Sequence, residues 1–273
     1  MGLLPQCSPY QPGRIAVSLK RAGQSAYLVL IYGFLYAPIL VLVVYSFNDS
    51  KYSLEWQGLT WEWYQNLFED PDLLQVALNS ALIATLSATV ATVIGTMAAV
   101  ALYRYRFFGR QLLNALIFVL MMTPDIVMGI ALLILFASLS LPLGFWTLLL
   151  AHITFNIPFV VVTVLSRISG FDRHLIEAAK DLGATEFQIF RRIVLPLLTP
   201  AVVAGWLLSF TLSMDDVMVS FFVTGPTFEI LPLKIYSMVR LGVTPEINAL
   251  CTTMLGVTLA MILIAQRLLR EKT

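Results

Sequence analysis

Long apolar segments separated by short polar connections dominate this chain of 273 residues and limit what it can fold into. A helix needs about 20 consecutive apolar residues to cross the hydrocarbon core of a bilayer. Six segments meet this requirement, at roughly 26–47, 76–103, 112–137, 144–166, 197–224 and 247–266. Composition agrees, because 59% of the residues are apolar and only 12% are charged. The sequence therefore predicts an all-α membrane protein with six transmembrane helices, some long enough to be tilted or broken.

Basic residues are distributed unevenly between the two sides that this threading defines. Fourteen of the 17 Lys and Arg residues fall in the N-terminal tail, the C-terminus and the connections after the second and fourth segments. The opposite side holds eight acidic residues and only three basic ones, Lys51, Lys234 and Arg240. Because cytoplasmic loops carry an excess of Lys and Arg, both termini and the loop 167–196 are predicted to be cytoplasmic. Residues 1–25 then form a cytoplasmic tail, and 26–273 form one six-span domain.

The loop between the fourth and fifth segments predicts two short helices joined by a sharp turn. Asp172 is placed to cap a helix that begins at Arg173. Gly183 stands where a helix commonly ends in the left-handed conformation. Thr185, with Gln188 three residues later, forms a capping box for a second helix. The first helix carries an apolar stripe at helical spacing, formed by Leu175, Ala178, Ala179 and Leu182.

The same loop carries the spacing EAA-x3-G-x9-I-x-L-P, which is matched by Glu177, Ala178, Ala179, Gly183, Ile193, Leu195 and Pro196. This pattern resembles the loop by which permease subunits of bacterial ABC importers dock onto their ATPase. An ordinary amphipathic loop would explain the caps but not the full spacing. The chain has no G-x4-G-K-[ST] motif for phosphate binding. The resemblance thus implies a type I importer permease that is not an enzyme, with ATP and Mg²⁺ bound by a partner ATPase.

Three acidic residues lie inside the predicted spans, namely Asp125, Asp215 and Asp216. A charged Asp at the centre of a spanning helix costs about 2.5–3.5 kcal/mol on insertion scales. No Lys or Arg lies inside a span, which leaves a polar cavity, protonation, a partner subunit or a cationic solute to explain these acids. Adjacent helical residues point about 100° apart. One aspartate of the pair is therefore expected to face a solute pathway, and the other to bond backbone or hydroxyl groups such as that of Ser213.

Other polar and aromatic side chains surround these acids in the sequence. Trp206, Phe210 and Met214 lie within three turns of the aspartate pair, where aromatic rings attract ammonium groups or simply pack against other helices. Asp125 follows Pro124, so the helix is expected to break there, and the carboxylate either caps freed N–H groups or serves the pathway. No metal site is expected. Neighbouring hydroxyl or carbonyl groups are expected to satisfy two further polar residues, His152 and Asn156.

Four further stretches are similar to the spermidine/putrescine (PotC-like) permease family, at 101–107, 124–128, 208–216 and 224–238. The resemblance implies a subunit of the bacterial cytoplasmic membrane, in contact with lipid and not with nucleic acid. Its implied partners are a homologous six-span permease, an ABC ATPase dimer and an extracytoplasmic polyamine-binding protein. Alternative interpretations are an importer of an amino acid, iron or a thiamine-like solute, and an ion-coupled secondary transporter. The aromatic loop 48–75 fits either an interfacial helix or a surface that receives the binding protein.

Overall fold

The computed structural model describes residues 13–50, 55–171, 174–242 and 244–270, and helices make up most of this part. The predictions for residues 1–12 and for Asp172 lie outside the described residues. The long helices are α1 (Gly13–Tyr45), α3 (Pro71–Arg104), α4 (Arg110–Met122), α5 (Asp125–Ser138), α6 (Phe145–Ile168), α9 (Leu195–Asp215) and α12 (Pro245–Arg270). The shorter elements are α2 (Glu62–Glu69), α7 (His174–Asp181), α8 (Glu186–Ile189), the π-helix η1 (Phe190–Val194), α10 (Met218–Val223) and α11 (Leu231–Leu241).

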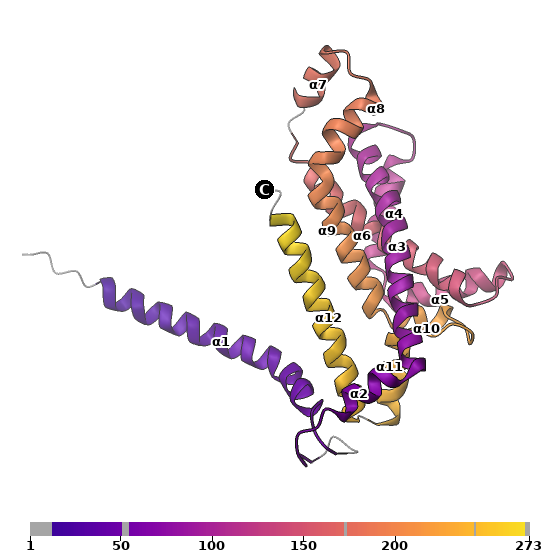
Figure 1. Ribbon diagram of the computed structural model, residues 1–273. Helices are drawn as coiled ribbons and strands as arrows, with labels where there is room; N and C mark the ends of the chain where they lie inside the picture. Colours follow the sequence, from indigo (N-terminus) through magenta and orange to yellow (C-terminus); the bar gives the residue numbers. More distant parts are fainter. Residues whose placement is uncertain (1–12, 51–54, 172–173, 243, 271–273) are drawn as a thin grey trace, which may run out of the picture.

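The centre of the fold is a bundle of α3, α6 and α9, which pack against one another (Figure 1). Small residues make this close approach possible, as is common between membrane helices. A Cβ atom at Gly95 of α3 would lie 2.7 Å from the Cβ of Val160 on α6. A Cβ atom at Gly205 of α9 would lie 3.4 Å from Cγ1 of the same valine. Glycine at these two positions lets Val160 sit between the two neighbouring helices.

Two of the predicted spans are broken. The segment predicted at 112–137 forms α4 and α5, whose axes differ in direction by 115°, with the break at Thr123 and Pro124. Proline lacks a backbone N–H and disfavours helical geometry in the residue before it, which explains the break at the expected place. The segment predicted at 197–224 is helical only to Asp215, and the chain is extended at Asp216 before α10 begins.

Among the described residues, the helices that are long and apolar enough to cross a membrane are fewer than the six predicted spans, and α12 is not one of them. Within the described ranges, four helices are long and apolar enough to cross, or up to five if α4 and α5 form one span. The helix α12, predicted as the sixth span, is continuous over Pro245–Arg270. A count of six spans remains a prediction.

Pairs of short helices lie at the two ends of the bundle (Figure 1). At one end lie α7 and α8, and at the other lie α2 and α11. The helix α1 extends away from the bundle, and large apolar side chains along it, such as Phe34 and Leu40, are exposed. Exposed apolar side chains of this kind suit a lipid environment.

Candidate functional site

The three acids predicted inside the spans line one cavity of about 340 Å³. Asp125 begins α5, Asp215 ends α9, and Asp216 lies between α9 and α10. The two helix breaks thus bring carboxylates that are about 90 residues apart in the sequence to the same space. Among these three, Asp125 and Asp215 are exposed, whereas the Asp216 side chain is largely buried. The residue at the N-cap of α5 is Pro124, which makes no side-chain cap, and within the described residues no hydrogen bond from the start of α5 to the Asp125 carboxylate is present, so the capping interpretation of Asp125 is not supported.

Asp216 has a structural role at the second break. Its carboxylate accepts hydrogen bonds from the backbone N–H groups of Val219, at 3.3 Å, and Ser220, at 2.8 Å, and from the Ser220 hydroxyl at 2.7 Å. These contacts satisfy N–H groups that the start of α10 would otherwise leave unpaired. The expectation that one aspartate of the pair would bond backbone or hydroxyl groups is confirmed, although the hydroxyl is that of Ser220 and not that of Ser213. The helix also ends before Asp216, so the expected 100° offset does not apply, and both aspartates line the same cavity.

A buried histidine connects this break to the central bundle. His152 of α6 is fully buried, and its Nδ1 shares a hydrogen bond with the Ser213 hydroxyl. Its Nε2 lies 2.9 Å from the Ser220 hydroxyl and 3.7 Å from Asp216 Oδ2. The Ser213 hydroxyl is also 3.0 Å from the hydroxyl of Ser87 on α3. Neighbouring hydroxyls thus satisfy His152, which confirms that prediction, and they connect the start of α10 to both α3 and α6.

Asn156, one turn further along α6, does not meet the same expectation. Its side chain is fully buried, and neither amide atom has a hydrogen-bond partner within the described part of the chain. A buried amide without partners is costly, typically by 1–3 kcal/mol for each group, so this position needs a separate explanation.

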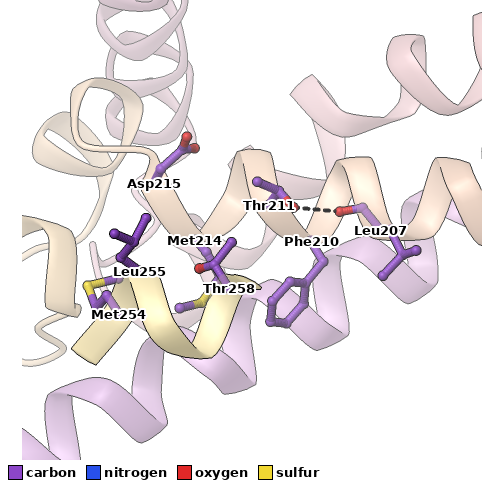
Figure 2. Close-up of a pocket in the computed structure, with 8 residues that line it drawn as sticks. All are labelled: Leu207, Phe210, Thr211, Met214, Asp215, Met254, Leu255 and Thr258. Carbon is purple, nitrogen blue, oxygen red and sulfur yellow. Dashed lines mark hydrogen bonds between the residues drawn. The ribbon is translucent and has the colours of Figure 1, made fainter. Parts of the chain in front are cut away.

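Asp215 also lines a second cavity of about 240 Å³ between α9 and α12, which includes Phe210 and Met214. Figure 2 shows its carboxylate pointing away from the α12 residues Met254 and Leu255. Asp215 therefore lies at the border of the two cavities. Trp206 lines neither of them.

Of the two aromatic residues predicted near the aspartate pair, Phe210 lines a cavity together with Asp215 and Trp206 does not. The ring of Trp206 stacks on that of Phe210, with centroids 5.4 Å apart. Its indole N–H donates to the Thr89 hydroxyl at 3.1 Å. Trp206 is therefore bonded to α3 and lies one helical turn before Phe210, which lines the second cavity.

Phe155 and Phe159 of α6 line the cavity with the three acids, and sequence reasoning did not single them out. Within an apolar span they are indistinguishable in type from residues that face lipid. Their spacing of four places them on one helix face, which is the signal that was available. Two aromatic rings and three carboxylates around one space form a suitable environment for an organic cation.

The turn at Gly183 and the capping box predicted in the loop 167–196 are present. Gly183 follows α7 with a φ of 78°, and its N–H donates to Lys180 O at 2.9 Å. The N–H of Ala184 donates to Ala179 O at 3.0 Å, and this pair of bonds ends the helix in a Schellman motif. The Thr185 hydroxyl accepts from Gln188 N, and the Gln188 side chain accepts from Thr185 N, which completes the capping box.

The surface of this loop is apolar in part and held by ion pairs at its base. Leu175, Ala178 and Leu182 of the predicted stripe are exposed, and only Ala179 is buried. Glu186 forms ion pairs with Arg104 at the end of α3 and with Lys180 of α7, the latter at 3.2 Å. Of the remaining motif positions, Glu177 is exposed on α7, Ile193 lies in the π-helix η1, and Leu195 and Pro196 begin α9.

Comparison with known proteins identifies the family. The profile described as "Binding-protein-dependent transport system inner membrane component" matches residues 91–270. The chain belongs to this family. It is 58% identical, over 93% of its length and 97% of the relative, to the "Spermidine/putrescine transport system permease protein PotC" of Escherichia coli (strain K12). It is 44% identical, over 84% of both chains, to the "Putrescine transport system permease protein PotI" of the same organism.

The family assignment agrees with a structural likeness. A chain from the crystal structure of a bacterial alginate ABC transporter, in complex with a periplasmic protein bound to an alginate pentasaccharide, has a TM-score of 0.73 to this fold. The match covers 94% of this chain and 95% of that one, at 17% identity. At that identity the likeness establishes the fold of an ABC importer permease and not the solute. The family members are transport permeases, and the helices of this chain agree with a multi-pass membrane protein.

Proposed function

We propose that this chain is the permease subunit of an ATP-driven importer of polyamines such as spermidine and putrescine. Its extensive identity with permeases of spermidine/putrescine and putrescine transport systems supports the solute class. The observation that carries the proposal at the level of the site is the cavity lined by Asp125, Asp215 and Asp216. Acidic residues inside a membrane domain are costly and usually mark functional sites. In this proposal a cationic solute supplies their countercharge.

Within this cavity the three carboxylates have different tasks in the proposal. Asp216 is engaged by three hydrogen-bond donors at the start of α10 and shapes the wall. Asp125 and Asp215 are exposed and bind the ammonium groups of the solute through charge-assisted hydrogen bonds. Phe155 and Phe159 contribute their ring faces to the same cations. Phe210 continues the aromatic lining past Asp215 into the second cavity, and Trp206 stacks on its ring.

Energy for transport comes, in this proposal, from a separate ABC ATPase dimer that binds ATP and Mg²⁺. The loop 167–196 docks onto it, with Glu177, Gly183 and the exposed Leu175 and Leu182 at the contact. The continuous run of α8, η1 and α9 leads from this loop to Asp215 at the cavity, so that movement of the loop is transmitted along one element. ATP-driven closure of the ATPase shifts the population between inward-open and outward-open states.

The remaining partners follow from the type of transporter. A homologous six-span permease completes the pathway, and an extracytoplasmic binding protein delivers the polyamine. The orientation proposed from the basic residues places both termini in the cytoplasm. The aromatic segment around α2 then lies on the outer side, where it meets lipid headgroups or the binding protein.

The test is uptake by the assembled transporter in proteoliposomes, with the binding protein outside and ATP inside. We expect labelled spermidine or putrescine to enter only with ATP, and excess unlabelled polyamine to compete, whereas amino acids, ferric iron and thiamine do not. Asp125→Asn should reduce uptake, and Asp72→Asn, which neutralises an exposed acid in the first turn of α3, should leave it unchanged. Uptake that continues without ATP would favour a secondary transporter, and competition by another solute would replace the polyamine assignment.

A further inference from the structure

The three central helices are in a fixed register that can be read from their contacts. At one level, Ser87 of α3, His152 of α6 and Ser213 of α9 are joined by hydrogen bonds. At a second level, Val160 of α6 meets Gly95 of α3 and Gly205 of α9. The two levels are eight residues apart on each helix, with α9 running in the opposite direction. Because a helix rises 1.5 Å per residue, they are separated by about 12 Å.

A middle level must therefore lie halfway, four residues from each of the others. It consists of Ala91 on α3, Asn156 on α6 and Ser209 on α9, all of which are 0% exposed. Neither amide atom of Asn156 nor the hydroxyl of Ser209 has a hydrogen-bond partner among the residues that the structure describes. The hydroxyl of Thr92, next to Ala91 on α3, is also buried and likewise has no partner within that part of the chain.

This middle level has the chemistry of a hydration site. An Asn side chain offers one acceptor oxygen and two donor hydrogens, and a Ser hydroxyl offers one donor and two acceptor lone pairs. Ala91 adds only a methyl group to this level, so Asn156 and Ser209 supply its polar groups. Neutral side chains with no exposure suit a small neutral molecule that can both donate and accept, and they offer no countercharge for an ion.

We propose that the middle level holds a buried water molecule, hydrogen-bonded between the Asn156 amide and the Ser209 hydroxyl. Buried waters typically make about three hydrogen bonds to polar groups that would otherwise be unsatisfied. The Thr92 hydroxyl on α3 is available at the same height as a third partner. The water links α3, α6 and α9 one turn from the His152 and Ser213 contact. This proposal is independent of which solute the transporter carries.

A high-resolution cryo-electron microscopy map of the wild-type transporter in lipid nanodiscs tests the proposal directly. We expect a discrete density within hydrogen-bond distance of both the Asn156 amide and Ser209 Oγ. The contacts of His152 with Ser213 and Ser220, one turn away, show whether side chains and ordered groups are resolved at this depth. A well-resolved level without that density, in which the amide bonds directly to Ser209 or to a backbone carbonyl, would overturn the proposal.

A double-mutant cycle supplies an independent measurement. Asn156→Leu removes the polar atoms at similar size, and Ser209→Ala removes the hydroxyl. If one water serves both residues, each single variant lowers the melting temperature of the assembled transporter. The double variant should then lose less than the sum of the two changes, because each single variant leaves the other residue's polar group without its shared partner, and the double variant removes both groups. Ser166→Ala on α6, whose exposed hydroxyl donates to the Thr163 carbonyl of its own helix, is the control. Additive losses would contradict a shared water.

Discussion

Asp215 and Asp216 are neighbours in the sequence, but their carboxylates have different surroundings. Asp216 accepts three hydrogen bonds from the start of α10, and its side chain is 10% exposed. Asp215 is exposed at the border of two cavities and is flanked by Phe210 and Met214. The break in the helix explains this difference, because each carboxylate leaves the chain in a different backbone conformation. Loss of charge should therefore affect stability at one position and transport at the other.

We expect Asp215→Asn to reduce spermidine and putrescine uptake while the protein keeps its melting temperature. Loss of one charge-assisted contact with an ammonium group costs about 1–3 kcal/mol, which is roughly tenfold to a hundredfold in affinity or rate. Asp216→Asn should instead lower the melting temperature, because both carboxylate oxygens accept hydrogen bonds and an amide nitrogen cannot, which leaves a donor unpaired at a cost of about 1–3 kcal/mol. Radiolabelled uptake and thermal unfolding of both variants separate these effects. Parental uptake in the Asp215 variant would remove the physical support for a cation site here.

The two phenylalanines of the cavity give a second prediction at this scale. Phe159→Leu keeps the site apolar but removes the ring face, and a cation–π contact contributes about 0.5–2 kcal/mol. We expect a loss of about twofold to thirtyfold in apparent polyamine affinity, with a comparable effect for Phe155→Leu. Phe118→Leu, on the exposed face of α4, is the matched control. Equal behaviour of the cavity variants and the control would show that the rings only pack.

At the scale of elements, the loop that carries α7 and α8 depends on the conformation of one glycine. Gly183 has a φ of 78°, and a Cβ atom there would have no atom within 4 Å. A substitution would therefore act through the backbone and not through a clash. The turn fixes the direction of α7 relative to α8, and with it the position of the exposed Leu175 and Leu182.

We expect Gly183→Val to insert normally but to lower both uptake and co-purification of the ATPase, because a β-branched residue resists positive φ. Gly183→Asn should retain more of both, since Asn adopts the left-handed conformation more readily. Co-purification and uptake are measured together for the two variants. If Val and Asn behave alike, the conformation of the turn does not control docking.

The sequence predicted the elements whose structure depends on local interactions. The turn at Gly183 and the capping box of Thr185 with Gln188 follow from neighbouring residues, and both are present. The Pro124 break was also predictable, because proline disfavours helix at the residue before it. The break at Asp216 was not, because it depends on contacts of α10 with distant helices. For the same reason, Phe155 was not distinguished from residues that face lipid.

At the scale of the whole molecule, the sharp bend between α4 and α5 leaves two topologies to compare. The pair either crosses the membrane as one broken span or enters and leaves on the same side. In the first case the connection after α5, near Leu139, lies on the opposite side from Arg106, before α4. In the second case both lie on the same side, and every later segment is reversed. The structure agrees with the first arrangement, because α3 and α6 run in the same direction and Glu186 forms an ion pair with Arg104, which puts the loop 167–196 at the same end of the bundle as Arg106. The excess of basic residues in this loop also favours it.

Cysteine labelling in cells decides between these topologies. In a variant with Cys7 and Cys251 replaced by Ser, single cysteines are placed at exposed positions. With six spans, an impermeant maleimide should label Glu62→Cys, Leu139→Cys and Glu229→Cys from outside, and Arg106→Cys and Leu182→Cys only after permeabilisation. If α4 and α5 are re-entrant, Leu139→Cys joins the protected group and Leu182→Cys becomes accessible from outside. That result would place the loop of α7 and α8 away from any cytoplasmic ATPase. The coupling proposal would then fail, although the family assignment and the cavity would remain.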